Sequence, residues 1–325
     1  MVLDKTSRKK YIVDFTEALS LALILEVSAY PKPGNVHRLR DRPKLRYEAF
    51  LATGILAYKY FKRGIIRGMK WSVKDFVLGD LVYGLVRDVI KKANSSNTCL
   101  GSSLLLSLLS VSAGKCILNE CVRVEDITSY SSDVIRSTTV LDSIYYYMAI
   151  RLASPSYIKP CDYTARFVNV WDPLYRKKLL ERDQRLYGIL QYSSNFDIVA
   201  REAINGFSQC LEAERFLRSR VSKNKELNRS IVETYLYLLS RNLDTVVYLK
   251  HGRDVAKKIS SRATSVLDTV LNSNSNWINA VLEFDRELHG RGLNPGATAD
   301  LVAATLALYM FRNIMTSSTL LGLSY

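Results

Sequence analysis

Apolar residues recur along most of this chain at intervals of three and four, the spacing of one face of a helix. In the first such run, residues 11–27, the side chains of Phe15, Leu19 and Ala22 fall on the same side. The pattern predicts helices over residues 11–27, 47–61, 73–92, 100–113, 124–135, 141–153, 174–190, 197–220, 227–239, 253–271, 277–288 and 299–315. No alternating stretch requires a sheet, so we predict an all-α fold.

Two of these segments carry additional signals. Ser72 is placed to cap the helix over 73–92, and Asp75, three residues later, would complete a capping box. Residues 100–113 are nearly all apolar or small, which indicates a buried central helix.

The chain has 325 residues, of which 48% are apolar and 24% charged, a globular composition. We expect a single large multi-helix domain over residues 1–325, with functional loops at the helix ends. The proline-containing loop over 154–173 is an alternative domain boundary, although one domain with a long functional loop is favoured.

The net charge of +15 favours polyanionic partners, either nucleic acid or small polyphosphates. Together with 20 tyrosines, it leaves a basic helical nucleic-acid-binding protein without catalytic activity as an alternative. No recognised nucleic-acid motif occurs and the basic residues are spread along the chain, so this alternative is not favoured.

No apolar stretch reaches the length that spans a bilayer, and the first ten residues lack the apolar core of a signal peptide. We therefore expect a cytoplasmic protein without a membrane partner. The five cysteines form no Cys-x-x-Cys pair and no zinc-type spacing, which predicts reduced, structural thiols: Cys99, Cys116, Cys121, Cys161 and Cys210. The oligomeric state is left open.

The stretch over residues 26–42 separates the first two predicted helices. Pro31 and Pro33 disfavour helix in the residues that precede them, so the first helix should stop by about Ala29 and the chain should then run extended. Gly34 permits a turn or a close approach to a ligand. With Lys32 and three arginines, this rigid basic loop is a candidate phosphate site.

A second polar segment, residues 95–101, leads into the buried central helix. Asn97 and Thr98 are good helix caps, and the free N–H groups of a helix start suit phosphate. The alternative is a capping turn with no ligand.

Acidic and basic residues gather in a third segment, residues 244–252. Asp244 is followed by Lys250, His251 and Gly252, which could supply an acid, a base and a glycine turn to a site. The alternative is a helix end with Gly252 in the left-handed position and Lys250 and His251 near the negative end of the helix dipole.

The fourth segment, residues 293–300, enters the last apolar helix through Asn294-Pro295-Gly296. Thr298 is a candidate cap, and Asp300 then falls in the first turn, where the dipole favours a carboxylate. Asp300 could act as a base or bind a metal, or it could merely complement the dipole.

Common signatures of other enzyme classes are missing from the sequence. There is no P-loop, no Gly-x-Gly-x-x-Gly opening a helix, no His-Glu-x-x-His and no Gly-x-Ser-x-Gly. P-loop, Rossmann and serine-hydrolase functions therefore have little support.

The helix that ends in Glu26-Val27 and is followed by Pro-Lys-Pro-Gly-Asn-Val over 31–36 resembles the signature of the triphosphoribosyl-dephospho-CoA synthase family. The resemblance extends over about residues 14–312. Further matches follow in the family's order: Asn97-Thr98 with Gly101, Asp244-Thr245 with Gly252, and Asn294-Pro295-Gly296 with Asp300.

This resemblance implies an all-α enzyme that uses ATP as a substrate. Adenine leaves, and the triphosphoribosyl group passes to the ribose 2′-hydroxyl of 3′-dephospho-CoA or a related nucleotide acceptor. Because breaking the bond from C1′ to adenine develops oxocarbenium character, such an enzyme needs cations and Mg²⁺ for the phosphates, a carboxylate base and a donor for adenine.

The resemblance also implies roles for the motif residues. The catalytic candidates are Asp300, Asp244, His37 and His251, and the metal candidates are Asp41, Asp244 and Asp300. The nucleotide-binding candidates are Lys32, Pro33, Gly34, Asn35, Asn97, Thr98, Gly101, Lys250, Gly252, Asn294 and Gly296.

The chain departs from the bacterial pattern directly after Pro-Lys-Pro-Gly. Bacterial members usually carry a Gly-x-His-x-Asp-Met-like stretch there, whereas residues 36–43 read Val-His-Arg-Leu-Arg-Asp-Arg-Pro. The chain is therefore identified as a divergent member, with a dephospho-CoA-like acceptor. A helical scaffold that has lost activity is a third possibility, against which Lys32, Asp244 and Asp300 argue.

Overall fold

The structure, a computed structural model, describes residues 5–71, 75–121, 123–159, 166–272 and 277–322. Across these ranges the regular elements are helices, as predicted, and the only β-type pairs are two isolated bridges in the loop after the first helix. The helices are α1 (Lys5–Ser28), α2 (Tyr47–Lys70), α3 (Gly79–Lys92), α4 (Leu100–Leu118), α5 (Val124–Arg136), α6 (Val140–Ala153), α7 (Tyr175–Glu181), α8 (Leu186–Ser193), α9 (Ile198–Ile204), α10 (Ser208–Asn224), α11 (Leu227–Arg241), α12 (Thr245–His251), α13 (Arg253–Asn272), α14 (Trp277–Gly290) and α15 (Gly296–Ser317).

Helix α4 is the predicted central helix, and nearly all of its residues are buried. It packs against α1, α2, α3, α5 and α15. Glycines allow its closest approach to α2, because a Cβ on Gly68 would lie 1.9 Å from the carbonyl oxygen of Val111. α4 continues to Leu118, so the expectation that no apolar stretch reaches membrane-spanning length was wrong for this helix. However, 89% of its apolar window is buried inside the protein, which is typical of a core helix.

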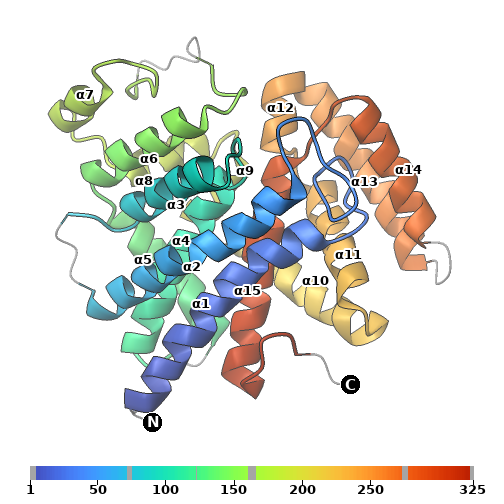
Figure 1. The fold of residues 1–325 in the computed structure, drawn as a ribbon, viewed down its shortest axis with the longest axis horizontal. Coiled ribbons are helices and arrows are strands. Elements are labelled where there is room, and N and C mark those ends of the chain that lie inside the picture. Colours follow the sequence, from blue (N-terminus) through green and yellow to red (C-terminus); the bar gives the residue numbers. More distant parts are fainter. Residues whose placement is uncertain (1–4, 72–74, 122, 160–165, 273–276, 323–325) are drawn as a thin grey trace.

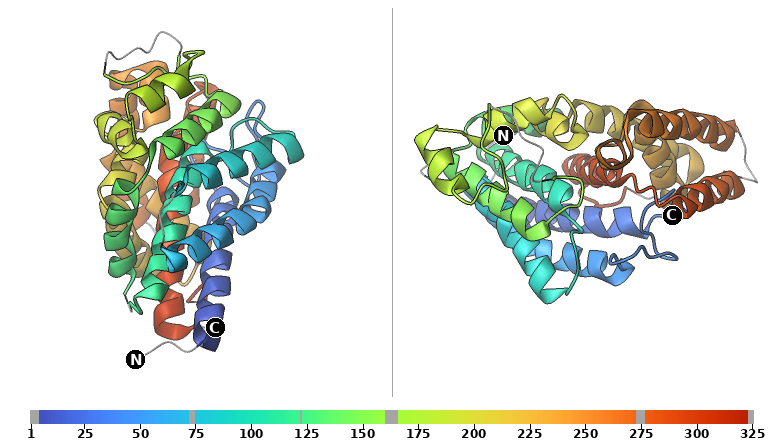
Figure 2. Two further views of the ribbon diagram at one scale, coloured as in Figure 1. Left: turned by 90° about the vertical axis from the view of Figure 1, so that its left-hand side faces the viewer. Right: turned by 90° about the horizontal axis from the view of Figure 1, so that it is seen from above.

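Helix α15 is the second buried helix, and it packs against α1, α4, α10 and α11. Buried apolar side chains from Phe15 in α1 to Ile314 in α15 belong to one contiguous core. The start of α1 and the end of α15 lie at the same end of the molecule, as Figures 1 and 2 show. The start of α15 and the loop over 29–46 lie toward the opposite end (Figure 1). That end contains the four polar segments singled out from the sequence.

Helix α3 begins at Gly79, later than the predicted 73. Its first N–H groups are bound by a residue distant in the sequence, because the Asp142 carboxylate of α6 accepts from the N–H groups of Leu78 and Gly79 at 2.9 and 2.7 Å. The predicted capping box with Asp75 was therefore wrong, and Ser72 lies outside the described residues.

Two predicted helices are each divided in two. The segment over 174–190 forms α7 and α8, with Asp183 in the left-handed region at φ +43° between them. The segment over 197–220 forms α9 and α10, divided at Gly206 and Phe207, which have φ values of +65° and +57°. Left-handed residues end a helix, and an apolar periodicity does not reveal them when they are not glycine.

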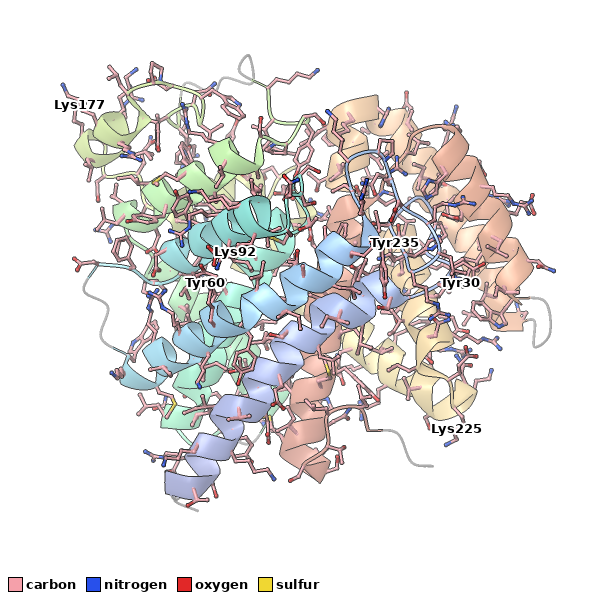
Figure 3. All side chains as sticks on the ribbon, viewed as in Figure 1. Tyr30, Tyr60, Lys92, Lys177, Lys225 and Tyr235 are labelled. Carbon is pink, nitrogen blue, oxygen red and sulfur yellow. A yellow bond between two sulfur atoms is a disulfide. The ribbon has the colours of Figure 1, made fainter. Side chains whose placement is uncertain are left out.

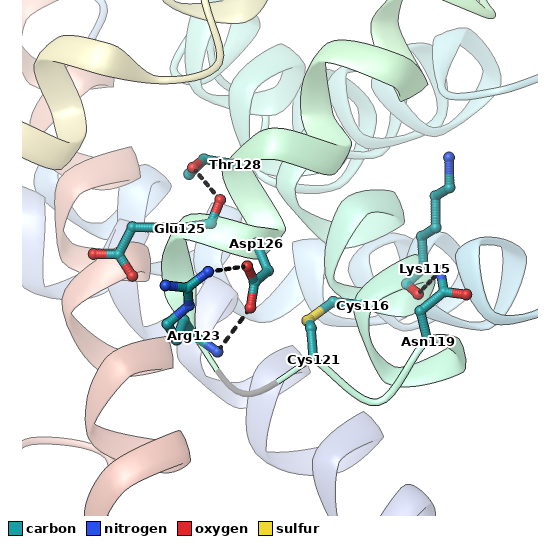
Figure 4. Close-up of a disulfide and its surroundings, with 8 residues drawn as sticks. All are labelled: Lys115, Cys116, Asn119, Cys121, Arg123, Glu125, Asp126 and Thr128. Carbon is teal, nitrogen blue, oxygen red and sulfur yellow. Dashed lines mark hydrogen bonds and ion pairs between the residues drawn. A yellow bond between two sulfur atoms is a disulfide. The ribbon is translucent and has the colours of Figure 1, made fainter.

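Cys116 and Cys121 are joined as a disulfide at the end of α4 (Figure 4). The turn after Leu118 brings their Cα atoms to 5.2 Å, within the usual range for a disulfide. The prediction of reduced thiols was wrong for this pair. Cys99 and Cys210 are free and buried, in line with structural thiols, and Cys161 lies outside the described residues.

Candidate active site

The loop over 29–46 is packed against α11 and α14. The backbone of Tyr30 exchanges hydrogen bonds with the Asn228 side chain of α11, and the Tyr235 hydroxyl donates to the Pro33 carbonyl oxygen at 2.8 Å. Figure 3 shows Tyr30 and Tyr235 on this side of the molecule. Helix α1 ends at Ser28, as the prolines predicted. The carbonyl of Pro33 is thus used in packing, and Pro33 does not line the cavity described below.

Gly34 makes the predicted turn, with φ +73°, and a Cβ there would lie 2.8 Å from the Leu293 carbonyl oxygen. Its N–H donates to the Asp285 carboxylate of α14 at 2.9 Å. This N–H is therefore occupied by the protein itself in this structure, and its expected contact with a phosphate stays a prediction.

Asp285 also binds two side chains of the loop. His37 Nε2 lies 3.5 Å and Arg40 Nη1 3.1 Å from its carboxylate, while Arg42 donates to the Leu293 carbonyl oxygen at 2.9 Å. Burial alone would raise the pKa of Asp285, but the hydrogen bonds from His37 and Gly34 bring it below the usual value. The divergent part of the loop is thus a structural anchor on α14, and His37, almost fully buried, does not line the cavity as a proton donor would.

Lys32 is completely buried and pairs with Glu26 of α1, both with its carboxylate and, at 2.9 Å, with its carbonyl oxygen. Burial lowers the pKa of Lys32 and raises that of Glu26, and their attraction opposes both shifts. Glu26 lines the cavity and Lys32 does not. Lys32 therefore does not reach the cavity, where a phosphate was expected. It instead pairs with Glu26 on the side of that residue away from the cavity.

A cavity of about 460 Å³ opens where α1, α2, α4, α12 and α15 meet. Eight of the predicted nucleotide-binding or catalytic residues line it: Asn35, Asn97, Thr98, Gly101, Lys250, Asn294, Gly296 and Asp300. The four polar segments, which are distant in the sequence, therefore meet in one place.

Asp300 is held at the start of α4. One oxygen of its carboxylate accepts from the Ser102 N–H at 2.8 Å, and the other lies against Gly101, where an added Cβ would be 2.1 Å away. Burial raises the pKa of Asp300 well above the usual value, and the charge of Glu26 raises it further. The carboxyl group therefore has an enhanced affinity for a proton, as a general base does.

The start of α4 carries the predicted caps. The Asn97 side-chain oxygen accepts from the N–H of Leu100 at 2.9 Å and of Cys99 at 3.2 Å. The Thr98 and Thr53 hydroxyls lie 2.8 Å apart, which ties this helix start to α2. Asn97 therefore holds the turn that leads into α4, although the cap position itself is Cys99, and both Asn97 and Thr98 line the cavity.

Asp244 does not line the cavity. One carboxylate oxygen accepts from the N–H groups of Val246 and Val247, and the other from the N–H and hydroxyl of Thr298, all at 2.7 to 3.1 Å. Burial raises the pKa of Asp244 to about 6, and these bonds oppose the rise. With both oxygens occupied, Asp244 joins α12 to α15, which is the arrangement of a structural carboxylate; its role as base or metal ligand stays a prediction.

The residues at the end of α12 differ in their placement. Lys250 lines the cavity, with its ammonium group 5.8 Å from the centre of the Tyr157 ring. Gly252 ends the helix at φ +89° and His251 is exposed, and neither lines the cavity. The helix-end interpretation is confirmed for Gly252, and the predicted proton donor His251 is displaced from the site.

The turn before α15 presents an acceptor without a partner. The Asn35 amide donates to the Pro295 carbonyl oxygen at 3.1 Å, which ties the first loop to this turn. Asn294 also lines the cavity, and its buried side-chain oxygen has no hydrogen-bond partner among the residues that the structure describes. A buried acceptor in this state is available to a donor group of a ligand in the cavity.

Sequence reasoning missed several lining residues. Tyr157 comes from the proline-containing loop, which has no helical periodicity. Phe50 lies within the predicted helix over 47–61, where an apolar residue indicates core packing, and Lys44 lies outside the four polar segments. Glu26 could have been found, because it begins the first motif and stands one helical turn from the loop.

The predicted metal ligands do not converge. Asp41 is exposed, accepts from the Tyr47 N–H at 2.8 Å, and does not line the cavity. Among the described residues, no group of three or more His, Cys, Asp or Glu side chains could hold a metal ion. Within the described part of the chain, the carboxylates that line the cavity are those of Glu26 and Asp300.

Curated relatives share the chemistry suggested by these motifs. The chain is 25% identical over 294 residues to a probable 2-(5″-triphosphoribosyl)-3′-dephosphocoenzyme-A synthase of Albidiferax ferrireducens, covering 87% of this chain and 86% of the relative. It is 30% identical over 111 residues to the 2-(5″-triphosphoribosyl)-3′-dephosphocoenzyme-A synthase of Pectobacterium atrosepticum, a match that spans 34% of this chain and 35% of that relative.

A solved structure has a similar fold. It is a crystal structure from Archaeoglobus fulgidus, provisionally named triphosphoribosyl-dephospho-CoA synthase, with a TM-score of 0.61 and 23% identity over 84% of this chain and the whole of the other. The family model described as ATP:dephospho-CoA triphosphoribosyl transferase matches residues 13–319. The chain therefore belongs to the ATP:dephospho-CoA triphosphoribosyl transferase family.

Proposed function

We propose that the cavity at the start of α4 transfers the triphosphoribosyl group of ATP to the ribose 2′-hydroxyl of 3′-dephospho-CoA or a related nucleotide, with release of adenine. The observation that carries the proposal is the placement of Asp300, whose partly buried carboxyl group lines a cavity built from all four motif segments. Family membership supports the same reaction.

Asp300 and Glu26 suit the reacting centre. As the bond from C1′ to adenine breaks, positive charge develops on the ribose, and two carboxylates in a partly buried cavity stabilise it. Asp300, with its raised pKa, accepts the proton of the attacking hydroxyl. Lys32 acts as a positioning residue, because it pairs with Glu26 and does not reach the cavity.

The mouth of the cavity suits the phosphates and the base. Lys44 and Lys250 supply positive charge from opposite segments, and the rings of Phe50 and Tyr157 offer faces on which a purine can stack. The buried side-chain oxygen of Asn294 would accept a hydrogen bond from an amino group such as that of adenine.

The residues present fit a Mg²⁺ ion that is shared with the substrate. Magnesium is usually held by one or two carboxylates together with substrate phosphates, and Glu26 would provide one, which leaves Asp300 as the base. A bound Mg²⁺ would neutralise charge on the triphosphate. The full protein ligand set expected from Asp41, Asp244 and Asp300 is not proposed, because these three carboxylates do not meet.

The test is to incubate the pure protein with ATP, Mg²⁺ and dephospho-CoA and to measure free adenine by mass spectrometry. We expect adenine in proportion to a triphosphoribosylated acceptor. Release of adenine without acceptor modification would change the proposal to hydrolysis, and no adenine with any CoA-like or nucleoside acceptor would refute it.

No observation on the described residues, and neither of the relatives above, favours the nucleic-acid-binding alternative. Some of the positive charge that suggested this alternative is bound within the protein. Arg40 pairs with Asp285 of α14, and Arg42 donates to the Leu293 carbonyl oxygen before α15.

A further inference from the structure

Arginine side chains gather around a second cavity, on the other side of α12 from the candidate active site. Its volume is about 400 Å³, and Arg201, Arg241 and Arg253 line it from α9, α11 and the start of α13. No carboxylate lines this cavity within the part of the chain that the structure describes.

Helix α12 forms a wall common to both cavities. Val246 and Lys250, four residues apart, face the first cavity, whereas Tyr248 lines the second. Residues two apart on a helix point about 200° from each other, so these side chains leave α12 on opposite faces. The second cavity is therefore separate from the first, although only one helix divides them.

The arginines of the second cavity have spare donors. For Arg253, which is exposed, no ion pair or hydrogen bond of the side chain is present among the described residues. Arg201 donates through Nε to the Ser194 carbonyl oxygen at 3.1 Å, and we find no other bond of its side chain in the described ranges. Arg241 lies over the Tyr237 ring, 4.4 Å from its centre, and the nearest acid, Glu212, is 4.0 Å away.

We propose that this second cavity binds a diphosphate group. Arginine guanidinium groups bind phosphate oxygens through paired hydrogen bonds, and three of them around one cavity match the charge of a diphosphate. The Asn242 side chain, 5% exposed, adds a polar group to the cavity wall. The rings of Phe196 and Tyr248 supply an apolar side, which suits a diphosphate carried on an organic molecule.

The experiment is calorimetric titration of the full chain with inorganic diphosphate. We expect Arg253→Gln and Arg241→Gln each to weaken one binding event about tenfold, the loss typical of a charged hydrogen-bonding partner. Lys257→Gln, which removes the same charge one turn along α13, and Lys250→Gln, which alters the first cavity, should leave that event within about twofold of wild type.

Equal affinity in wild type and both arginine variants would overturn the proposal. So would a loss confined to Lys250→Gln, because the diphosphate would then occupy the first cavity. The titration needs no turnover, so it can fail or succeed independently of the transferase assay.

Kinetics then identifies the source of the diphosphate, and this arm rests on the proposed function. A higher KM for dephospho-CoA in Arg253→Gln, and not in Lys257→Gln, would support binding of the acceptor's own diphosphate. An unchanged KM, with weakened calorimetric binding, would support a separate diphosphate-bearing ligand at the same site.

Discussion

At the scale of single residues, the protonation of Asp300 governs the expected chemistry. Burial and the charge of Glu26 raise its pKa, so a larger share of the protein carries it as a neutral acid at mildly acidic pH. A base must be ionised to accept a proton, so the rate should rise with pH through a value above that of an ordinary aspartate.

We predict that kcat/KM of the wild type rises with pH in the acidic range, the acidic limb of its pH profile, and that Asp300→Asn loses this dependence. The rate of adenine release should fall about 10²- to 10⁴-fold in this variant, the range for loss of a general base. Asp133→Asn, at an exposed position of α5, should keep both the rate and the limb. An Asp300→Asn enzyme with wild-type rate would place the base elsewhere.

Gly101 sets the distance between α4 and Asp300. A Cβ at this position would lie 2.1 Å from a carboxylate oxygen, so Gly101→Ala must displace Asp300 or the start of α4. We predict a loss of about 1–3 kcal/mol in the free energy of unfolding, measured by urea denaturation, and a strong loss of adenine release.

Gly290→Ala is the matched control for this substitution. Gly290 also lies in a helix, α14, but a Cβ there would meet no atom within 4 Å. It should retain activity and stability. If Gly101→Ala behaves like this control, the close contact between Gly101 and Asp300 is not needed for activity or stability.

At the scale of helices, the sequence predicted most elements but fewer of their ends. Amphipathic and apolar runs identify α1, α2 and α4 because core burial follows the helical period. The break between α9 and α10 was missed because Phe207, a buried aromatic residue, adopts the left-handed conformation usually left to glycine. Tertiary contacts hold Phe207 in this conformation, and the residues next to it in the sequence do not indicate those contacts.

The candidate site, like the helices, was predictable in part. The order of the motifs predicted that Asp300, Gly101 and Lys250 belong to one site, and the structure places all three around one cavity. The partners of Arg40 and Arg42 in the first loop were not predictable, because Arg40 pairs with Asp285, some 245 residues later, and Arg42 donates to the carbonyl oxygen of Leu293. Pairing over that distance cannot be inferred from composition or local spacing.

Asp244 tests the distinction between a capping and a catalytic carboxylate. It joins α12 to α15 through four hydrogen bonds, so replacing one acceptor oxygen by an amide leaves buried donors unpaired. We predict that Asp244→Asn lowers the free energy of unfolding by about 1–3 kcal/mol in urea denaturation.

Asp268→Asn, at an exposed position of α13, should stay within about 0.5 kcal/mol of wild type. If Asp244→Asn abolishes adenine release while its stability stays at that of this control, Asp244 acts in the chemistry and the capping assignment is wrong.

At the scale of the whole molecule, the net charge of +15 acts on two polyanionic substrates at once. Figure 3 shows Lys92, Lys177 and Lys225 on well separated parts of the surface, so the attraction is not confined to the cavity mouth. A field of this kind raises the association rate of ATP and is screened by salt.

We predict that kcat/KM for ATP falls about three- to tenfold from roughly 0.05 M to roughly 0.5 M KCl, with kcat nearly constant, because screening weakens the long-range attraction and leaves the chemical step unchanged. Lys250→Gln should lower kcat/KM at every salt concentration, because it removes a cation from the cavity itself. Its salt dependence should remain close to that of wild type, since one charge in fifteen is a small part of the field. If the variant instead loses the salt dependence, the attraction is local to the mouth of the cavity, and the rest of the basic surface serves neither substrate.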